Sequence, residues 1–182
     1  MRSAFSGRPA NQYYTLTALL ATRGAQTYTS RVIAGCVFTL GLITLSTIGS
    51  SATLQWEFGR VMLAGVAVLC FISTFIWLRH RWPTRTESGV LVLLAALAVP
   101  IGTIAPIIPM YGLLGSASFA LIIGYTALFH GPRLLAAVLA VAVGTLVYLA
   151  VRMSKVDLPL ALAGVALMLL LGFIMFLPIP GG

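Results

Sequence analysis

The chain has 182 residues, of which 60% are hydrophobic and only 8% are charged, and its mean hydropathy is +1.06. A soluble domain carries about 25% charged residues, so this composition excludes a soluble globular protein. The net charge of +8 comes from 11 basic and 3 acidic residues. Because the basic residues flank apolar runs, we expect them to contact a lipid bilayer with an anionic inner leaflet, and we expect no nucleic acid partner.

The N-terminal segment, residues 1–31, precedes the first apolar run and contains a predicted helix at about 11–28. Asn11 is the expected cap of this helix, because asparagine accepts hydrogen bonds from the first helical amides. With Arg23 near its edge, one broad face holds Tyr13, Leu16, Leu20 and Tyr28. This pattern predicts an amphipathic helix in the cytoplasmic interface of a membrane, and a partly ordered tail is the alternative.

Six apolar runs follow, and a helix needs about 20 apolar residues to cross a ~30 Å hydrocarbon core. The predicted spans are 32–49, 61–78, 89–105, 111–129, 134–151 and 158–177. Pro100 and Pro106 interrupt the third run, which membrane helices tolerate when neighbours satisfy the freed carbonyls. Short connections imply antiparallel neighbours. The predicted fold class is therefore all-α, a polytopic membrane protein with a compact six-helix transmembrane bundle over 32–178 and a short tail at 179–182.

The distribution of basic residues predicts the orientation of the bundle. With the N-terminus inside, eight basic residues lie in cytoplasmic segments: Arg2, Arg8, Arg23, Arg31, Arg79, Arg81, Arg85 and Arg133. Only Arg60, Arg152 and Lys155 lie outside. Cytoplasmic loops carry an excess of lysine and arginine, so we expect a multi-pass protein of the cytoplasmic (inner) membrane with both termini in the cytoplasm.

Residues that carry chemistry are scarce within the spans. The acidic residues Glu57, Glu87 and Asp157 all lie in predicted loops, and no charged residue lies near the middle of a span. Coupled transporters keep such residues on their pathway despite the cost, so the pattern disfavours a pump. No paired carboxylate, metalloprotease motif or nucleophile elbow occurs. We expect no enzymatic activity and no cofactor.

His80 and His130 both fall at the predicted cytoplasmic ends of spans. They could approach one another and ligate haem or a metal ion. No carboxylate or thiolate lies at the same depth, however, and the arginines beside His80 disfavour a metal ion. They are weak metal candidates, and the favoured interpretation places His80 in a solvated loop and His130 at the membrane boundary.

The fourth span carries small residues at every fourth position: Gly112, Ser116, Ala120 and Gly124. Such a stripe lies on one helix face and allows close approach of another helix. The partner helix could belong to the same bundle, to a second copy in a homodimer, or to another membrane protein. We expect the fourth span to pack centrally.

Three segments resemble a known family: "YYTLTALLATRGAQ", "WPTRTES" and "YGLLGSASFALIIGYTALFHGPRLL". They are similar to the N-terminal membrane region of actinobacterial GGDEF-domain proteins, in which a short helix and a six-span bundle precede a cytoplasmic diguanylate cyclase domain. The resemblance covers about residues 11–152. The matching positions are Tyr14, Leu16, Thr17, Arg23, Gly24, Trp82, Pro83, Arg85, Phe129 and His130.

No Gly-Gly-Asp/Glu-Glu-Phe signature occurs in the chain, so synthesis of cyclic di-GMP is not expected of it. The resemblance implies a non-catalytic sensory or anchoring membrane domain in signal transduction, either standing alone or forming part of a longer GGDEF protein. An output domain would then dock on the cytoplasmic face, with Arg23, Trp82, Arg85, His130 and Arg133 as candidates. The alternatives are a structural subunit of a membrane complex and a small pore for an uncharged solute.

Overall fold

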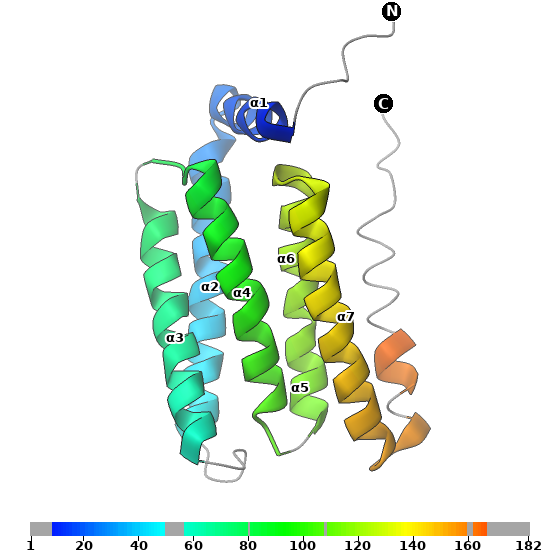
Figure 1. Ribbon diagram of the computed structural model, residues 1–182. Helices are drawn as coiled ribbons and strands as arrows, with labels where there is room; N and C mark the ends of the chain where they lie inside the picture. The colour runs from blue at the N-terminus through cyan, green and yellow to red at the C-terminus, as the bar shows by residue number, and fades with distance from the viewer. Residues whose placement is uncertain (1–8, 50–56, 80, 108, 160–161, 167–182) are drawn as a thin grey trace, which may run out of the picture.

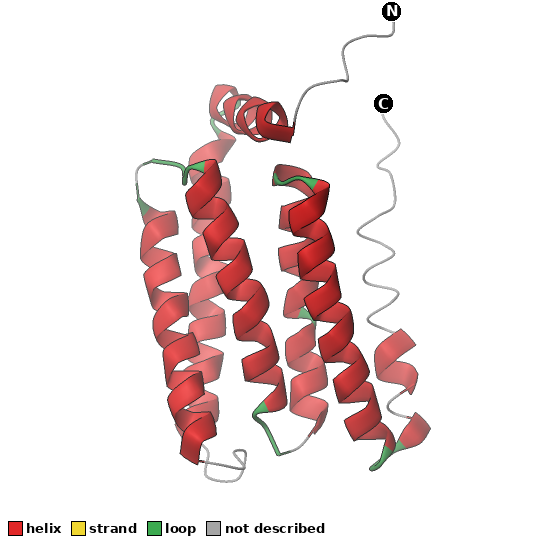
Figure 2. Ribbon diagram, viewed as in Figure 1, coloured by secondary structure: helices red, strands yellow, loops and turns green. Residues whose placement is uncertain are grey.

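The computed structural model describes residues 9–49, 57–79, 81–107, 109–159 and 162–166. It confirms the predicted all-α fold class, since every regular element in these ranges is a helix (Figure 2). Five helical segments are long and apolar enough to cross a membrane. They stand side by side as a polytopic bundle, and one short helix, α1, lies crosswise over one end of it (Figure 1). We call this end the α1 end.

The N-terminal segment forms two helices instead of one. Helix α1 spans Pro9–Thr22 and helix α2 spans Ala25–Gly49. The prediction that Asn11 caps α1 is wrong, because the helix already begins at Pro9, and proline is favoured in the first helical turn. Tyr28 belongs to α2 and is 73% exposed, so it does not share the face of α1 that contains Tyr13.

Gly24 separates the two helices, since its φ of +65° ends α1 and lets the chain turn into α2. A side chain at such a φ costs about 1–2 kcal/mol. We expect Gly24→Ala to lower the free energy of unfolding by that amount without a steric clash, because no atom lies within 4 Å of the added methyl group. Thermal unfolding in lipid nanodiscs measures this effect. Gly35→Ala, in α2 and equally open, is the matched control, and equal destabilisation of both variants would contradict the prediction.

The remaining spans are α3 (Glu57–Leu78), α4 (Arg85–Ile104), α5 (Pro109–Ser116), α6 (Ser118–Phe129) and α7 (Pro132–Ser154). The fourth predicted span is therefore two consecutive helices, α5 and α6. They are interrupted by a turn but run on in the same direction (Figure 1).

The C-terminal predictions lie mostly beyond the described residues. Of the sixth predicted span, 158–177, only residues 158–159 and 162–166 are described, and they are helical. The predicted tail at 179–182 also lies outside the described ranges.

Helix α4 begins four residues earlier than predicted because a capping box fixes its first turn. The Thr84 amide donates to Glu87 Oε2 at 2.8 Å, and the Glu87 amide donates to Thr84 Oγ1 at 3.2 Å. Arg81 also holds the same carboxylate, with 2.7 Å between Nη2 and Oε1. Such reciprocal bonds satisfy amides that a helix leaves open at its start. The helix continues through Pro100 to Ile104.

The buried core lies between α4, α6 and α7. Val92 and Ala96 of α4 and Val138 of α7 form its centre, and Ile122 and Ile123 of α6 pack against them. Large apolar side chains elsewhere on the spans are exposed, as with Phe75 at 71%. Exposed apolar surface on this scale needs lipid or protein to cover it, which agrees with the membrane assignment.

The small-residue stripe is partly an internal packing device. Gly112 and Ser116 are buried, whereas Ala120 and Gly124 are partly exposed. A methyl group on Gly112 would overlap the carbonyl oxygen of Thr103 in α4 and would lie 3.0 Å from Leu149 Cδ2 in α7. The first part of the stripe thus allows α5 to approach α4 and α7 of the same chain.

Candidate functional site at the α1 end

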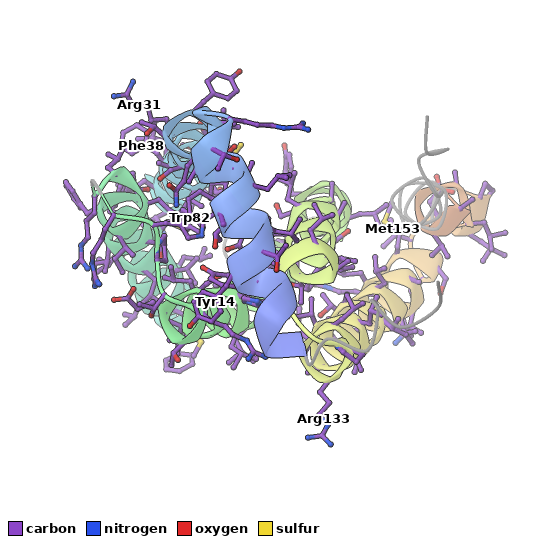
Figure 3. The ribbon with its side chains drawn as sticks, turned by 90° about the horizontal axis from the view of Figure 1, so that it is seen from above. Tyr14, Arg31, Phe38, Trp82, Arg133 and Met153 are labelled. Atoms are coloured by element: carbon purple, nitrogen blue, oxygen red, sulfur yellow. The ribbon has the colours of Figure 1, made fainter. Side chains whose placement is uncertain are left out.

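The α1 end brings together elements that are far apart in the sequence. Helix α1 crosses over the bundle and contacts α2 and α6 (Figures 1 and 3). All of the predicted docking candidates lie at this end, contributed by the α1–α2 turn, the α3–α4 loop, the start of α4 and the α6–α7 turn: Arg23, Trp82, Arg85, His130 and Arg133. Arg23 and Arg133 are exposed, Trp82 and Arg85 are half-buried, and His130 is buried.

Tyr13 fastens α1 to the bundle. Its side chain is only 1% exposed. The hydroxyl group donates to the Pro83 carbonyl at 2.6 Å and accepts a hydrogen bond from Trp82 Nε1 at 3.0 Å. The ring also contacts Phe129 and His130, with centroid distances of 6.1 and 5.8 Å. Burial raises the pKa of the Tyr13 phenol, so the hydroxyl group stays protonated at neutral pH and can donate a hydrogen bond.

An aromatic cluster continues from Tyr13 into the bundle. The ring of Trp77 meets Trp82 edge-on at 5.3 Å and Tyr125 edge-on at 5.7 Å. Tyr125 stacks on Phe129 at 4.8 Å. Ser30 of α2 donates a hydrogen bond to the Trp77 carbonyl, so α2 joins the same cluster. Aromatic pairs in these geometries are worth about 0.5–1.5 kcal/mol each beyond their buried area.

Ser88 forms a buried polar chain with Tyr125 and His130. Its side chain is fully buried, and its Oγ lies 2.6 Å from Tyr125 Oη and 3.3 Å from His130 Nε2. A serine beside a histidine can act as a nucleophile with its base. Here the hydroxyl is inaccessible and already bonded to Tyr125. Within the described ranges, no acidic side chain makes a hydrogen bond to the His130 ring, so the pair lacks an orienting carboxylate.

His130 is the C-cap residue of α6 and is only 7% exposed, so it lies at the end of the fourth predicted span, and its position at the membrane boundary stays a prediction. Ring contacts with Tyr13 and Tyr125 enclose it. His80 lies outside the described residues, and the pairing of the two histidines remains a prediction. Within the described ranges, no three histidine, cysteine, aspartate or glutamate side chains form a group that could hold a metal ion.

Burial, followed by the positive charge of Arg85, lowers the pKa of His130. The unfolded chain therefore binds a proton at a higher pH than the folded protein does, and stability decreases as pH falls below about 6.5. We expect a lower unfolding temperature at pH 5.5 than at pH 7.5, and His130→Gln should reduce this difference. A difference of the same size in His130→Gln, with His80→Gln as the control, would contradict this expectation.

A cavity of about 650 Å³ opens between the start of α4 and the α6–α7 turn. Its lining includes Arg85, Gly89, His130, Gly131, Arg133 and Leu134, and none of the described residues that line it is acidic. The two arginines in its lining give the cavity a positive potential. It lies next to the polar chain, because His130 belongs to both.

Sequence reasoning missed the polar groups that build this site. The sequence predicts Tyr13 on an apolar face, and neither Ser88 nor Tyr125 is among the predicted site residues. One signal was available for Tyr125, which precedes Phe129 by four residues and therefore shares its helix face. Ser88 carried no such signal, because its burial depends on α6 packing against α4.

Comparison with family models, with curated proteins and with solved structures finds no match for this chain. The resemblance to the membrane region of GGDEF-domain proteins therefore stays a prediction that rests on the quoted segments alone.

Proposed function

We propose that this protein is a non-catalytic sensory or anchoring domain of the cytoplasmic membrane, which presents its α1 end to a partner in the cytoplasm. The observation that carries the proposal is the attachment of α1 through the buried Tyr13 hydroxyl to Trp82 and Pro83. This attachment makes α1 and the ends of the spans one continuous surface. The proposal agrees with the resemblance to the membrane input module of GGDEF proteins.

The charge distribution supports this orientation. Among the described residues, the α1 end carries Arg23, Arg31, Arg79, Arg81, Arg85 and Arg133. The opposite end carries Arg60, Arg152 and Lys155. The positive-inside rule therefore favours a cytoplasmic α1 end, where α1 would also contact the anionic leaflet.

The way in which the polar side chains are used favours a structural and signalling role over catalysis. Tyr13, Ser88 and Tyr125 bond to the protein itself and thereby join α1, the α3–α4 loop, α4 and α6. Arg152 does the same at the opposite end, where it donates to the carbonyls of Ile104 and Ile107 at 3.0 and 3.2 Å. A displacement of α6 within the membrane would move Phe129 and His130 against Tyr13, and α1 would follow.

The orientation is tested by cysteine labelling of intact cells, with Cys36 and Cys70 replaced by serine. We expect Lys155→Cys to react with a membrane-impermeant maleimide and Arg81→Cys to react only after the cells are opened. The reverse pattern would place the α1 end outside and would contradict a cytoplasmic docking surface.

Flux measurements separate the proposal from its main rival, a pore. Purified protein in liposomes is mixed rapidly with glycerol or urea, and light scattering follows the change in vesicle volume. A sensory or anchoring domain should give the rate of empty liposomes at every protein density. A rate that rises in proportion to protein density would identify a facilitator and overturn the proposal.

A further inference from the structure

We propose that the cavity between the start of α4 and the α6–α7 turn binds a phosphate group, carried either by a lipid headgroup or by a soluble phosphate. This inference goes beyond the proposed function, because it assigns a ligand class to a site that the sensory or anchoring role does not require. The cavity volume of about 650 Å³ lies within the range of small-molecule sites, about 300–1,000 Å³.

The charges of the lining residues select an anion. Arg85 and Arg133 both line the cavity, and arginine presents a planar fork that bonds phosphate oxygens in pairs. The nearest carboxylate in the sequence, that of Glu87, is already bound by Arg81 and by the amide of Thr84. Within the described ranges, neither Arg85 nor Arg133 forms a salt bridge, so both guanidinium groups can bind an external anion.

The start of α7 adds a helix dipole of the right polarity. Gly131 is its N-cap residue, Pro132 occupies the first turn, and no side chain caps the helix. Pro132 has no N–H, and the amides of Leu134 and Leu135 donate to the Gly131 carbonyl, so the attraction of this terminus for phosphate comes mainly from the helix dipole. The start of α4 differs, because Thr84 and Glu87 already cap it. The contribution from helix dipoles therefore comes mainly from α7.

His130 supplies an independent, buried polar group. Its ring lines the cavity although the residue is only 7% exposed. Nε2 lies 3.3 Å from Ser88 Oγ, the only hydrogen bond of the ring to the described residues. Because no buried side-chain nitrogen or oxygen in the described ranges lacks a partner, Nδ1 is accessible to solvent. If Tyr125 donates to Ser88 and Ser88 donates to Nε2, the neutral ring keeps its proton on Nδ1. That N–H is then available to donate to a phosphate oxygen.

The location suits both sources of phosphate. Arg133 extends away from the bundle from the first turn of α7 (Figure 3), so its guanidinium group lies at the outer rim, where lipid headgroups and soluble anions can both reach it. Arg85 is half-buried and His130 is buried. A phosphate in the cavity could therefore contact both an exposed arginine and more buried polar groups.

The test uses the full chain in phosphatidylcholine nanodiscs, with two probes at constant ionic strength. One arm titrates inorganic phosphate, and the other increases the fraction of phosphatidylglycerol in the nanodisc. The increase in unfolding temperature gives the apparent affinity, because a ligand that binds only the folded state stabilises it. The variants are Arg85→Gln and Arg133→Gln. Arg31→Gln is the matched control, since Arg31 lies at the same end of the bundle but near the other end of α1, far from Arg133 (Figure 3).

We expect saturable stabilisation in at least one arm, with affinity reduced about tenfold by each cavity variant and changed less than twofold by the control. Tenfold corresponds to the loss of one charge-assisted hydrogen bond. An effect in the lipid arm alone identifies a headgroup site, and an effect with inorganic phosphate identifies a site for soluble phosphate. Lack of saturation in both arms, or an equal loss with Arg31→Gln, would overturn the proposal.

A second measurement does not depend on the folding of either cavity variant. The ¹⁵N resonances of the His130 ring in the wild-type protein, assigned with His80→Gln, should shift during the same titration. Stabilisation without such a shift would place the anion elsewhere on the basic surface and would also overturn the proposal. Neither result bears on the flux experiment, so the ligand assignment and the proposed function can fail separately.

Discussion

Replacing Tyr13 by alanine is expected to detach α1 from the bundle and to lower the free energy of its local opening by about 3–5 kcal/mol, the usual cost of deleting a buried aromatic ring. The variant loses ring contacts with Phe129 and His130 and the hydrogen bonds to Trp82 and Pro83. Hydrogen–deuterium exchange in nanodiscs measures the effect, as faster exchange of the α1 amides while those of α7 stay unchanged.

Two further variants separate the ring from its hydroxyl. Tyr13→Phe keeps the ring but leaves the Trp82 N–H and the Pro83 carbonyl without their hydrogen-bond partner. Each group that remains buried without a bound water costs about 1–3 kcal/mol. Tyr14→Ala is the control, because Tyr14 is 60% exposed and should leave exchange in α1 nearly unchanged. If the α1 amides exchange equally in wild-type protein and Tyr13→Ala, the proposed attachment does not exist.

Gly112→Ala should be the second severe substitution, with a loss of roughly 3 kcal/mol in the free energy of unfolding. The added methyl group would overlap the backbone oxygen of Thr103 and crowd Leu149. A backbone atom cannot rotate away as a flexible side chain does, so α5 must move from α4, and overpacking of this kind is destabilising. Thermal or denaturant unfolding in a fixed lipid environment measures the loss.

Gly144→Ala is the matched control for this substitution. Gly144 is also helical, but no neighbouring atom lies within 4 Å of the added methyl group. Alanine is a better helix former than glycine by about 1 kcal/mol, so this variant should be as stable as the wild type or slightly more stable. Equal unfolding temperatures of the two variants would show that α5 does not pack closely on α4.

Much of the fold follows from hydropathy alone. Apolar runs of sufficient length located α2, α3, α4 and α7, because a membrane span must satisfy its backbone internally and is therefore a helix. The first and last residues of the helices could not be predicted as well from hydropathy. The capping box at Thr84 makes α4 begin before the predicted start of the third span. Gly24 divides the segment that the sequence predicts as one helix. The turn at Ala117 within the fourth span had no sequence signal that we recognised.

The location of the candidate site could be predicted from the sequence, but the hydrogen bonds that build it could not. Arg85, His130 and Arg133 lie at one end of the bundle, and the order of the predicted spans is sufficient to predict this. The hydrogen bond from Tyr13 to the α3–α4 loop and the hydrogen bond between Ser88 and Tyr125 of α6 join residues 70 and 37 positions apart. Such pairs depend on how the helices pack around one another, which periodicity within a single helix does not encode.

The most direct test of the central claim, that α1 is held across the ends of the spans, is a distance measurement between spin labels. Tyr14 on α1 and Arg133 on α7 are both exposed and can carry the labels once Cys36 and Cys70 are replaced by serine. We predict one narrow distance distribution in nanodiscs, which becomes broad when Tyr13→Ala is added. A broad distribution with Tyr13 intact would contradict the account, because α1 would then move independently of the bundle.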